Sequence, residues 1–109
     1  MSSSVKASVE SEASLSAREI VGKLIDLYQT VVKPAIAEKD YAAGIELDVA
    51  VCNIKFLPHE QLHEILVTVP SSLGIISAGA TLAEMMENGN TSQVERAQAI
   101  LENKIAFYR

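Results

Sequence analysis

The sequence predicts a small all-α domain of four or five helices preceded by a flexible tail. Apolar residues recur at intervals of three and four along most of the chain, which is the period of a helix with one buried face. Residues that commonly cap helices precede several of these stretches. The chain has 109 residues and is 49% hydrophobic but only 5% aromatic. We therefore expect a single domain with one modest core built from aliphatic side chains.

The domain boundary is predicted close to residue 15. Residues 1–14 are rich in serine and show no apolar period, so we expect them to form a flexible tail. A single helical domain is expected over residues 15–109. Its first helix is predicted to begin at Ser16, whose hydroxyl can cap the helix while Glu19 reaches back from the third helical position.

The first helix is predicted to extend to about Lys33. Pro34 has no N–H to donate to Thr30 and disfavours a helical conformation in the residue before it. The helix therefore either ends at Lys33 or continues with a kink. Its apolar stripe consists of Ile20, Leu24, Leu27, Tyr28, Val31 and Val32.

The segment after Asp40 has two interpretations. Its apolar residues alternate over residues 45–51, as in a strand, which would make the fold α+β. As a helix over residues 44–56, the same segment has two apolar faces, as expected of a helix placed between neighbours. We favour the helix, because the alternation fails after Val51. The polar residues between the two faces are Glu46 and Asn53 on one side and Asp48 and Lys55 on the other.

Three further helices are expected in the second half of the chain. They begin near Pro58, which suits a first helical position, at Ser71 or Ser72, and at Thr91 or Ser92. The middle one of the three should end at Gly89, and a capping box of Ser92 with Glu95 should open the last one. The middle helix contains many small residues, which let another backbone approach closely: Gly74, Ser77, Ala78, Gly79, Ala80 and Ala83.

Charge and cysteine content exclude some classes of partner. The formal net charge is −5, and residues 56–95 contain five glutamates and no lysine or arginine. Binding to nucleic acid or to an anionic membrane surface would require clustered basic residues. Cys52 is the single cysteine and has apolar neighbours, so it is expected to pack in a core. Since we find no targeting signal, a reducing, cytoplasmic location is expected.

Residues 65–83 contain no charged side chain, which approaches the ~20 apolar residues of a spanning helix. A small membrane-associated protein is therefore a third hypothesis for the function. Pro70 near the middle of the stretch and the acidic flanks speak against a span. We expect a core helix instead.

The chain contains an H-E-x-x-H motif formed by its two histidines, His59 and His63, with Glu60 between them. On a helix this spacing places both imidazoles on one face beside a carboxylate, as in zinc hydrolases. Zinc would need a third ligand, for which Glu84 or Glu87 is the candidate, and Glu60 would be the general base. The motif and the order of elements resemble a reduced gluzincin metallopeptidase. This resemblance implies a small zinc-dependent metallohydrolase or metallopeptidase.

We favour the interpretation that both histidines lie on the exposed side of an amphipathic helix, with neighbouring acids that are solvated, and no cofactor is then expected. The predicted function is that of a non-enzymatic regulatory or assembly factor, such as an anti-activator or chaperone-like adaptor. It would bind a protein partner through apolar helix faces. The candidate partner-binding residues, with packing in the protein's own core as the alternative, are Met85, Met86, Phe107 and Tyr108.

Self-association is also predicted. The apolar content spread over several helices exceeds what one short bundle is expected to bury. A homodimer that shares the helices near residues 44–56 and 72–86 would cover the surplus.

Overall fold

A computed structural model describes residues 17–108 of the chain, and every regular element among them is helical. The predicted all-α bundle is therefore confirmed. The alternative strand over residues 45–51 is wrong, because this segment lies within a helix. The predicted tail over residues 1–14 and the predicted cap at Ser16 lie outside the described residues.

The N-terminal helix is continuous over residues 17–37. Residues 17–27 are α-helical, η1 (Tyr28–Val32) is a π-helical turn, and α2 (Lys33–Ala37) completes the rod. In the wide turn the Lys33 N–H donates to the Tyr28 carbonyl. In a regular α-helix Pro34 would leave one backbone hydrogen bond unmade, and its ring would clash with a carbonyl of the preceding turn. The wider π-turn accommodates both effects. Of the two predicted outcomes at Lys33, the helix therefore continues.

The chain turns back through η2 (Tyr41–Ala43) into α3 (Gly44–Lys55). Asp40 accepts a hydrogen bond from the Ala42 N–H, so it caps this turn as predicted. One face of α3 is buried in the core through Leu47, Val51 and Ile54.

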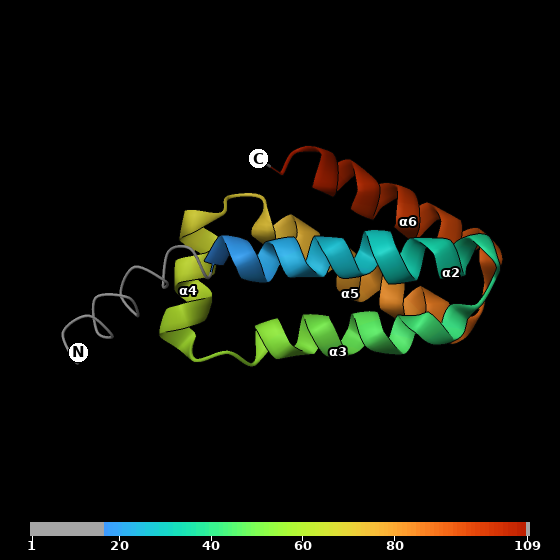
Figure 1. The fold of residues 1–109 in the computed structure, drawn as a ribbon, viewed down its shortest axis with the longest axis horizontal. Helices are drawn as coiled ribbons and strands as arrows, with labels where there is room; N and C mark the ends of the chain where they lie inside the picture. Colours follow the sequence, from blue (N-terminus) through green and yellow to red (C-terminus); the bar gives the residue numbers. More distant parts are fainter. Residues whose placement is uncertain (1–16, 109) are drawn as a thin grey trace.

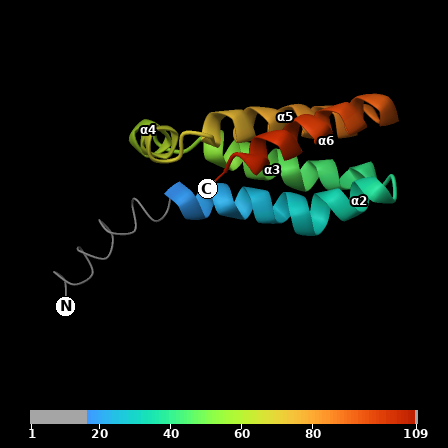
Figure 2. The same ribbon diagram turned by 90° about the horizontal axis from the view of Figure 1, so that it is seen from above.

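α4 (His59–Thr68) is short and crosses one end of the bundle, nearly perpendicular to the long helices (Figure 2). Pro58 precedes it in an extended conformation and is its N-cap, so the helix begins at His59, one residue after the first helical position that the sequence predicts. The Ser72 hydroxyl donates to the Ile65 carbonyl at 3.3 Å and ties α4 to the next helix. Ser72 thus bonds to α4 and does not cap its own helix, for which Ser71 is the N-cap.

α5 (Ser72–Asn88) ends as predicted at Gly89, which has a positive φ of 72° and donates its N–H to the carbonyls of Met85 and Met86. A left-handed residue of this kind satisfies the last carbonyls of a helix without the strain that a side chain would add.

α6 (Thr91–Ala106) is the last helix. Its N-cap is Asn90, whose side chain accepts from the Gln93 N–H at 3.0 Å. The predicted capping box of Ser92 with Glu95 is therefore wrong, because the N-cap lies two residues earlier, at Asn90, and the asparagine side chain satisfies a free N–H group of the first turn.

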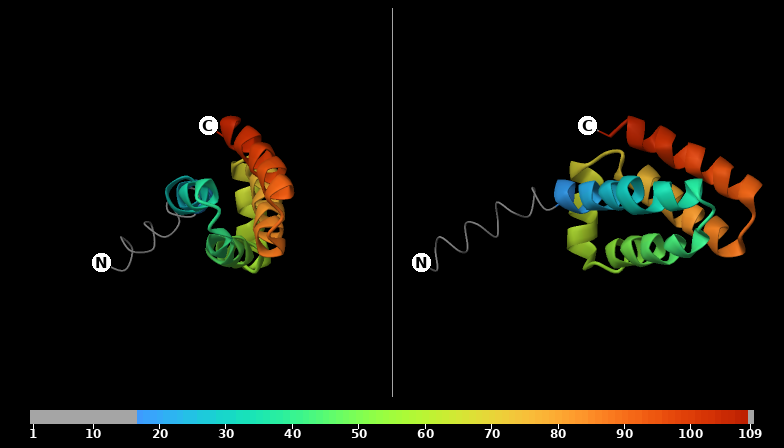
Figure 3. Two further views of the ribbon diagram at one scale, coloured as in Figure 1. Left: turned by 90° about the vertical axis from the view of Figure 1, so that its right-hand side faces the viewer. Right: turned by 45° about the vertical axis from the view of Figure 1, so that its right-hand side comes forward.

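The long helices run alternately back and forth along the bundle, and α4 joins two of them at one end (Figure 1). α3, α5 and α6 form a curved layer with α5 in the middle, and the N-terminal helix lies against its concave side (Figure 3, left). Side chains from all of these helices form one core. Its largest fully buried members are Tyr28, Leu47, Ile65, Ile75, Leu82, Met86 and Leu101.

Candidate functional site

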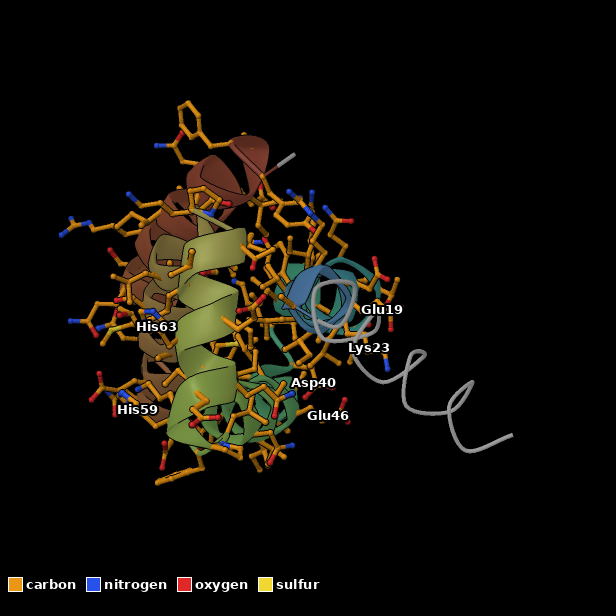
Figure 4. All side chains as sticks on the ribbon, turned by 90° about the vertical axis from the view of Figure 1, so that its left-hand side faces the viewer. Glu19, Lys23, Asp40, Glu46, His59 and His63 are labelled. Atoms are coloured by element: carbon orange, nitrogen blue, oxygen red, sulfur yellow. The ribbon has the colours of Figure 1, made fainter. Side chains whose placement is uncertain are left out.

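The H-E-x-x-H motif occupies the first turns of α4. His59 and His63 are both exposed, and they lie one turn apart on the side of α4 that faces away from the N-terminal helix (Figure 4). Glu60 between them is also exposed. The predicted juxtaposition of two imidazoles on one helix face is therefore present, on a solvated surface.

The third zinc ligand proposed from the sequence does not join this pair. Glu84 and Glu87 are exposed residues in the second half of α5, whose first residue, Ser72, is the end that lies next to α4. Twelve residues of helix place Glu84 about 18 Å farther along the axis than Ser72. Among the described residues, no three histidine, cysteine, aspartate or glutamate side chains come together in a group that could hold a metal ion.

The predicted partner-binding residues are divided between the core and the surface. Met86 is buried and lies against Gly44 at the contact between α5 and α3. Phe107, just after α6, is on the surface, with 73% of its area exposed. Tyr108 is half-buried, and its hydroxyl donates to the Arg18 carbonyl at 3.2 Å, which ties the end of the chain to the N-terminal helix.

The fourth of these residues, Met85, belongs to a groove along the outer seam between α5 and α6. Two adjoining hollows of about 360 Å³ and 200 Å³ share Thr81, Ala97 and Ile100 and form this α5–α6 groove. Exposed leucine and isoleucine side chains supply its apolar wall, since Leu73 is 64% and Ile100 is 48% exposed. Its remaining lining residues are Gly74, Ser77, Ala78, Gln93, Arg96 and Lys104.

The charged residues that line the α5–α6 groove, Arg96 and Lys104, are both basic, in a protein whose net charge is −5. Arg96, Ile100 and Lys104 follow one another at intervals of four on α6, so the two cations stand one turn on either side of an apolar residue. A ligand that fits this groove is therefore apolar along its length and acidic at positions about two turns apart.

A separate hollow of about 400 Å³ lies between the start of α3 and the end of α5. Its rim carries two acids, Asp48 and Glu87, and an exposed apolar residue, Ile45. Gly44 forms part of its wall, and a side chain at this position would come within 2.8 Å of the Met86 Cβ. The two helices thus touch closely on the inner side of this hollow.

A buried tyrosine links the N-terminal helix to α6. The Tyr28 hydroxyl, in the π-turn, donates to the Glu102 carboxylate at 2.5 Å, and Lys33 forms an ion pair with the same oxygen at 3.2 Å. Burial, with the neighbouring carboxylate, raises the pKa of Tyr28 far above its usual value. The hydrogen bond from Tyr28, followed by the charge of Lys33, lowers the pKa of Glu102. This cluster is therefore set to hold a neutral tyrosine against an ionised carboxylate.

Comparison of the chain with protein-family models, curated proteins and solved structures gives no match. Within the described part of the chain, no single helix is both long and apolar enough to cross a bilayer. α4 and α5 pass that test only as a pair, and they are bent by 110° relative to each other.

Sequence reasoning missed the α5–α6 groove. The signal was present on α6, where Arg96, Ile100 and Lys104 form a second stripe beside the buried one of Val94, Ala97 and Leu101. The partner of Tyr28 could not have been found in this way, because Glu102 is 74 residues away in the sequence.

Proposed function

We propose that this protein is a non-enzymatic regulatory or assembly factor that binds an amphipathic helix of another protein in the α5–α6 groove. The observation that carries the proposal is the combination of an exposed apolar seam with flanking cations in an acidic protein. Helix-in-groove binding uses apolar anchors at helical spacing, which a groove of this shape accommodates.

Small residues on the α5 side of the groove support the proposed kind of ligand. Gly74, Ser77 and Ala78 form a low wall, so the backbone of an incoming helix can lie close to α5. Apolar anchors of the ligand would contact Leu73 and Ile100, and its acidic residues would contact Arg96 and Lys104. Exposed ion pairs add little affinity, so they would chiefly determine the orientation and specificity of binding.

The proposal is tested by affinity capture with intact protein from an extract of its native cells, followed by mass spectrometry. Leu73→Asp and Ile100→Asp each place an acid in the apolar wall and should abolish capture of the specific partner. Val67→Asp on α4 is the matched control, because Val67 has the same 64% exposure as Leu73 but lies outside the groove. A synthetic peptide from the captured protein should become helical when it binds.

Two outcomes would contradict the proposal. Capture that is equally sensitive to Val67→Asp would show that general surface hydrophobicity, and not the groove, retains the partner. Hydrolytic activity that disappears with Glu60→Gln and stoichiometric zinc that disappears with His63→Ala would instead favour a metallohydrolase.

A further inference from the structure

The outer face of α3 is apolar and largely exposed. Ile45, Val49 and Phe56 are 69%, 52% and 84% exposed, and Cys52 between them is partly exposed. These side chains follow one another at intervals of four, three and four, which is the spacing of the buried seam in a two-stranded coiled coil. We name these four residues the α3 stripe.

We infer that the α3 stripe is the interface of a homodimer in which two α3 helices pack side by side in antiparallel orientation. The inference rests on the proposed function, because it treats an exposed apolar helix face as a surface that binds polypeptide. It adds that the occupant of this face is a second copy of the chain.

The sizes of the four side chains suit the antiparallel arrangement. With a two-fold axis between residues 50 and 51, Ile45 of one copy lies opposite Phe56 of the other, and Val49 lies opposite Cys52. Each large residue at an end of the interface then meets an aliphatic one, and the two smaller residues meet in the centre. The layers therefore differ less in volume than they would in a parallel pair, where Phe56 would meet Phe56 and Cys52 would meet Cys52.

Charge complementarity selects this orientation over the parallel one. Asp48 and Lys55 are exposed and flank the α3 stripe on the same side. In the antiparallel dimer Asp48 of each copy lies near Lys55 of the other, which gives two attractive ion pairs between the copies. In a parallel dimer Asp48 would meet the uncharged Asn53, and the counterpart of Lys55 would fall beyond the end of α3.

Asp48 and Lys55 do not pair with each other within one copy. Asp48 and Lys55 are seven residues apart on α3, about 10.5 Å along its axis. Among the described residues, Asp48 accepts a side-chain hydrogen bond from the Cys52 thiol, at 3.9 Å, and neither Asp48 nor Lys55 forms an ion pair. Asp48 also shares the rim of the hollow between α3 and α5 with Glu87, so a lysine from the second copy would arrive beside two carboxylates.

The position of α3 leaves room for the second copy. α3 is an edge of the curved layer, whereas α5 is enclosed between α3 and α6 (Figure 3, left). From the end of α3 the chain turns into α4, which crosses toward the other helices (Figure 1). The small residues of α5 do not extend this interface, because Gly79 already contacts Val51 and Leu47 of α3 within the same chain. The contact is therefore confined to α3.

The experiment measures the association of purified full-length protein by sedimentation equilibrium at low salt. The interface is small, so we expect a dissociation constant on the order of 10 µM. Asp48→Lys and Lys55→Asp should each weaken dimerisation roughly tenfold, because every substitution turns two attractive pairs into two repulsive ones. The double variant Asp48→Lys/Lys55→Asp should restore the wild-type constant to within about threefold.

Two controls keep the outcome interpretable. Val49→Asp places charge in the centre of the interface and should abolish the dimer, whereas Leu73→Asp in the α5–α6 groove should leave it intact. Circular dichroism should show that all variants fold, since each substituted residue is exposed. Cys52 provides an independent readout, because the two thiols lie about 4.5 Å apart along the helix axis in the proposed dimer. A short bismaleimide should join them, and Val49→Asp should prevent this.

A wild-type protein that remains monomeric at about 200 µM would overturn the inference. So would a double variant that stays as weak as either single one, because direct pairing between copies predicts recovery. Neither result affects capture of a partner by the α5–α6 groove, which uses other residues. Conversely, loss of that capture would leave the sedimentation result unchanged, so the two proposals fail separately.

Discussion

α5 and α3 both carry apolar residues on more than one side, yet the bundle encloses one and leaves the other half open. α5 has a neighbour on each flank, and its side chains Ile75 and Leu82 have no exposed surface. α3 is covered on one face, whereas Ile45 and Phe56 on its outer face remain mostly accessible. The difference shows that apolar content along a helix does not reveal which surface covers it. Position in the layer decides this.

The largest expected effect comes from removing a core side chain of α5. Leu82→Ala should lower the free energy of unfolding by about 3 kcal/mol, because it leaves a cavity at the centre of the layer. Leu73→Ala, the same change at an exposed position of the same helix, should alter it by less than about 0.5 kcal/mol. Urea titration of both variants measures the contrast. Similar losses would mean that α5 is not enclosed as described.

A glycine at the contact between α3 and α5 should tolerate no side chain. Gly44→Ala would place a Cβ within 2.8 Å of the Met86 Cβ, and we expect a loss of about 2 kcal/mol. Gly74→Ala in the α5–α6 groove meets only the flexible Lys104 chain, at 3.3 Å, so alanine's higher helix propensity should stabilise the protein by about 0.5 kcal/mol. Thermal denaturation distinguishes the two. A stabilising Gly44→Ala would show that α3 is loosely attached to α5.

The link between the N-terminal helix and α6 should make a smaller, pH-dependent contribution. Tyr28→Phe removes the hydrogen bond to Glu102 and should cost about 1 kcal/mol near neutral pH. The pKa of Glu102 is lower in the folded state, so its stabilisation is present above the ordinary value of 4.5 and is lost as the pH falls through the folded-state value. The difference between wild type and variant should therefore shrink in acid.

Tyr41→Phe is the control for this pH effect. Tyr41 donates to the Thr91 hydroxyl at 3.0 Å, a neutral partner on α6. Removing this hydrogen bond should lower the free energy of unfolding by about 1 kcal/mol or less, and this loss should stay the same across the acidic range. Urea titration between pH 3 and 7 in steps of about one unit measures it. If Tyr28→Phe behaved in the same way as Tyr41→Phe, the charge of Glu102 would have no part in holding the N-terminal helix.

The smallest effect is expected on the outer face of α3. Phe56→Ser should change the free energy of unfolding of the monomer, measured in dilute solution, by less than about 0.5 kcal/mol, since 84% of this side chain is already exposed. A loss of more than about 1 kcal/mol would show that Phe56 is covered within one copy. The apolar area of α3 that is free to bind another copy would then be smaller than the comparison with α5 indicates.

Local signals predicted most of the fold. Apolar periodicity and residues typical of helix ends together located the N-terminal helix, α4, α5 and α6, while α3 was preferred as a helix although its apolar residues alternate, and Asp40 and Gly89 act at the predicted places. One error arose where two nearby residues could each act as the N-cap of the same helix. Asn90, and not Ser92, caps α6, because a shift of two residues in the helix start decides which side chain faces the free N–H groups.

The candidate sites were less predictable, because they depend on which helix faces meet. The spacing of His59 and His63 correctly placed them on one face of a helix, but it contained no information about the distance to Glu84. The two apolar faces of α3 were recognised from the sequence, whereas the fact that only one is covered required the arrangement of the layer. The same holds for the α5–α6 groove, whose walls come from two helices.

The π-turn at Tyr28–Val32 has a consequence for the phase of the N-terminal helix. Tyr28, Val32 and Ile36 are all buried, although two successive intervals of four would carry a regular α-helix about 80° away from its starting side. The extra residue in the turn absorbs this difference. Deleting one of its exposed residues, such as Thr30, would leave the three buried residues at intervals of three and four, which a regular α-helix keeps on one side, so Ile36 should stay buried. The wide turn thus works as a phase adjuster, because it lets both halves of the helix bury side chains in the same core.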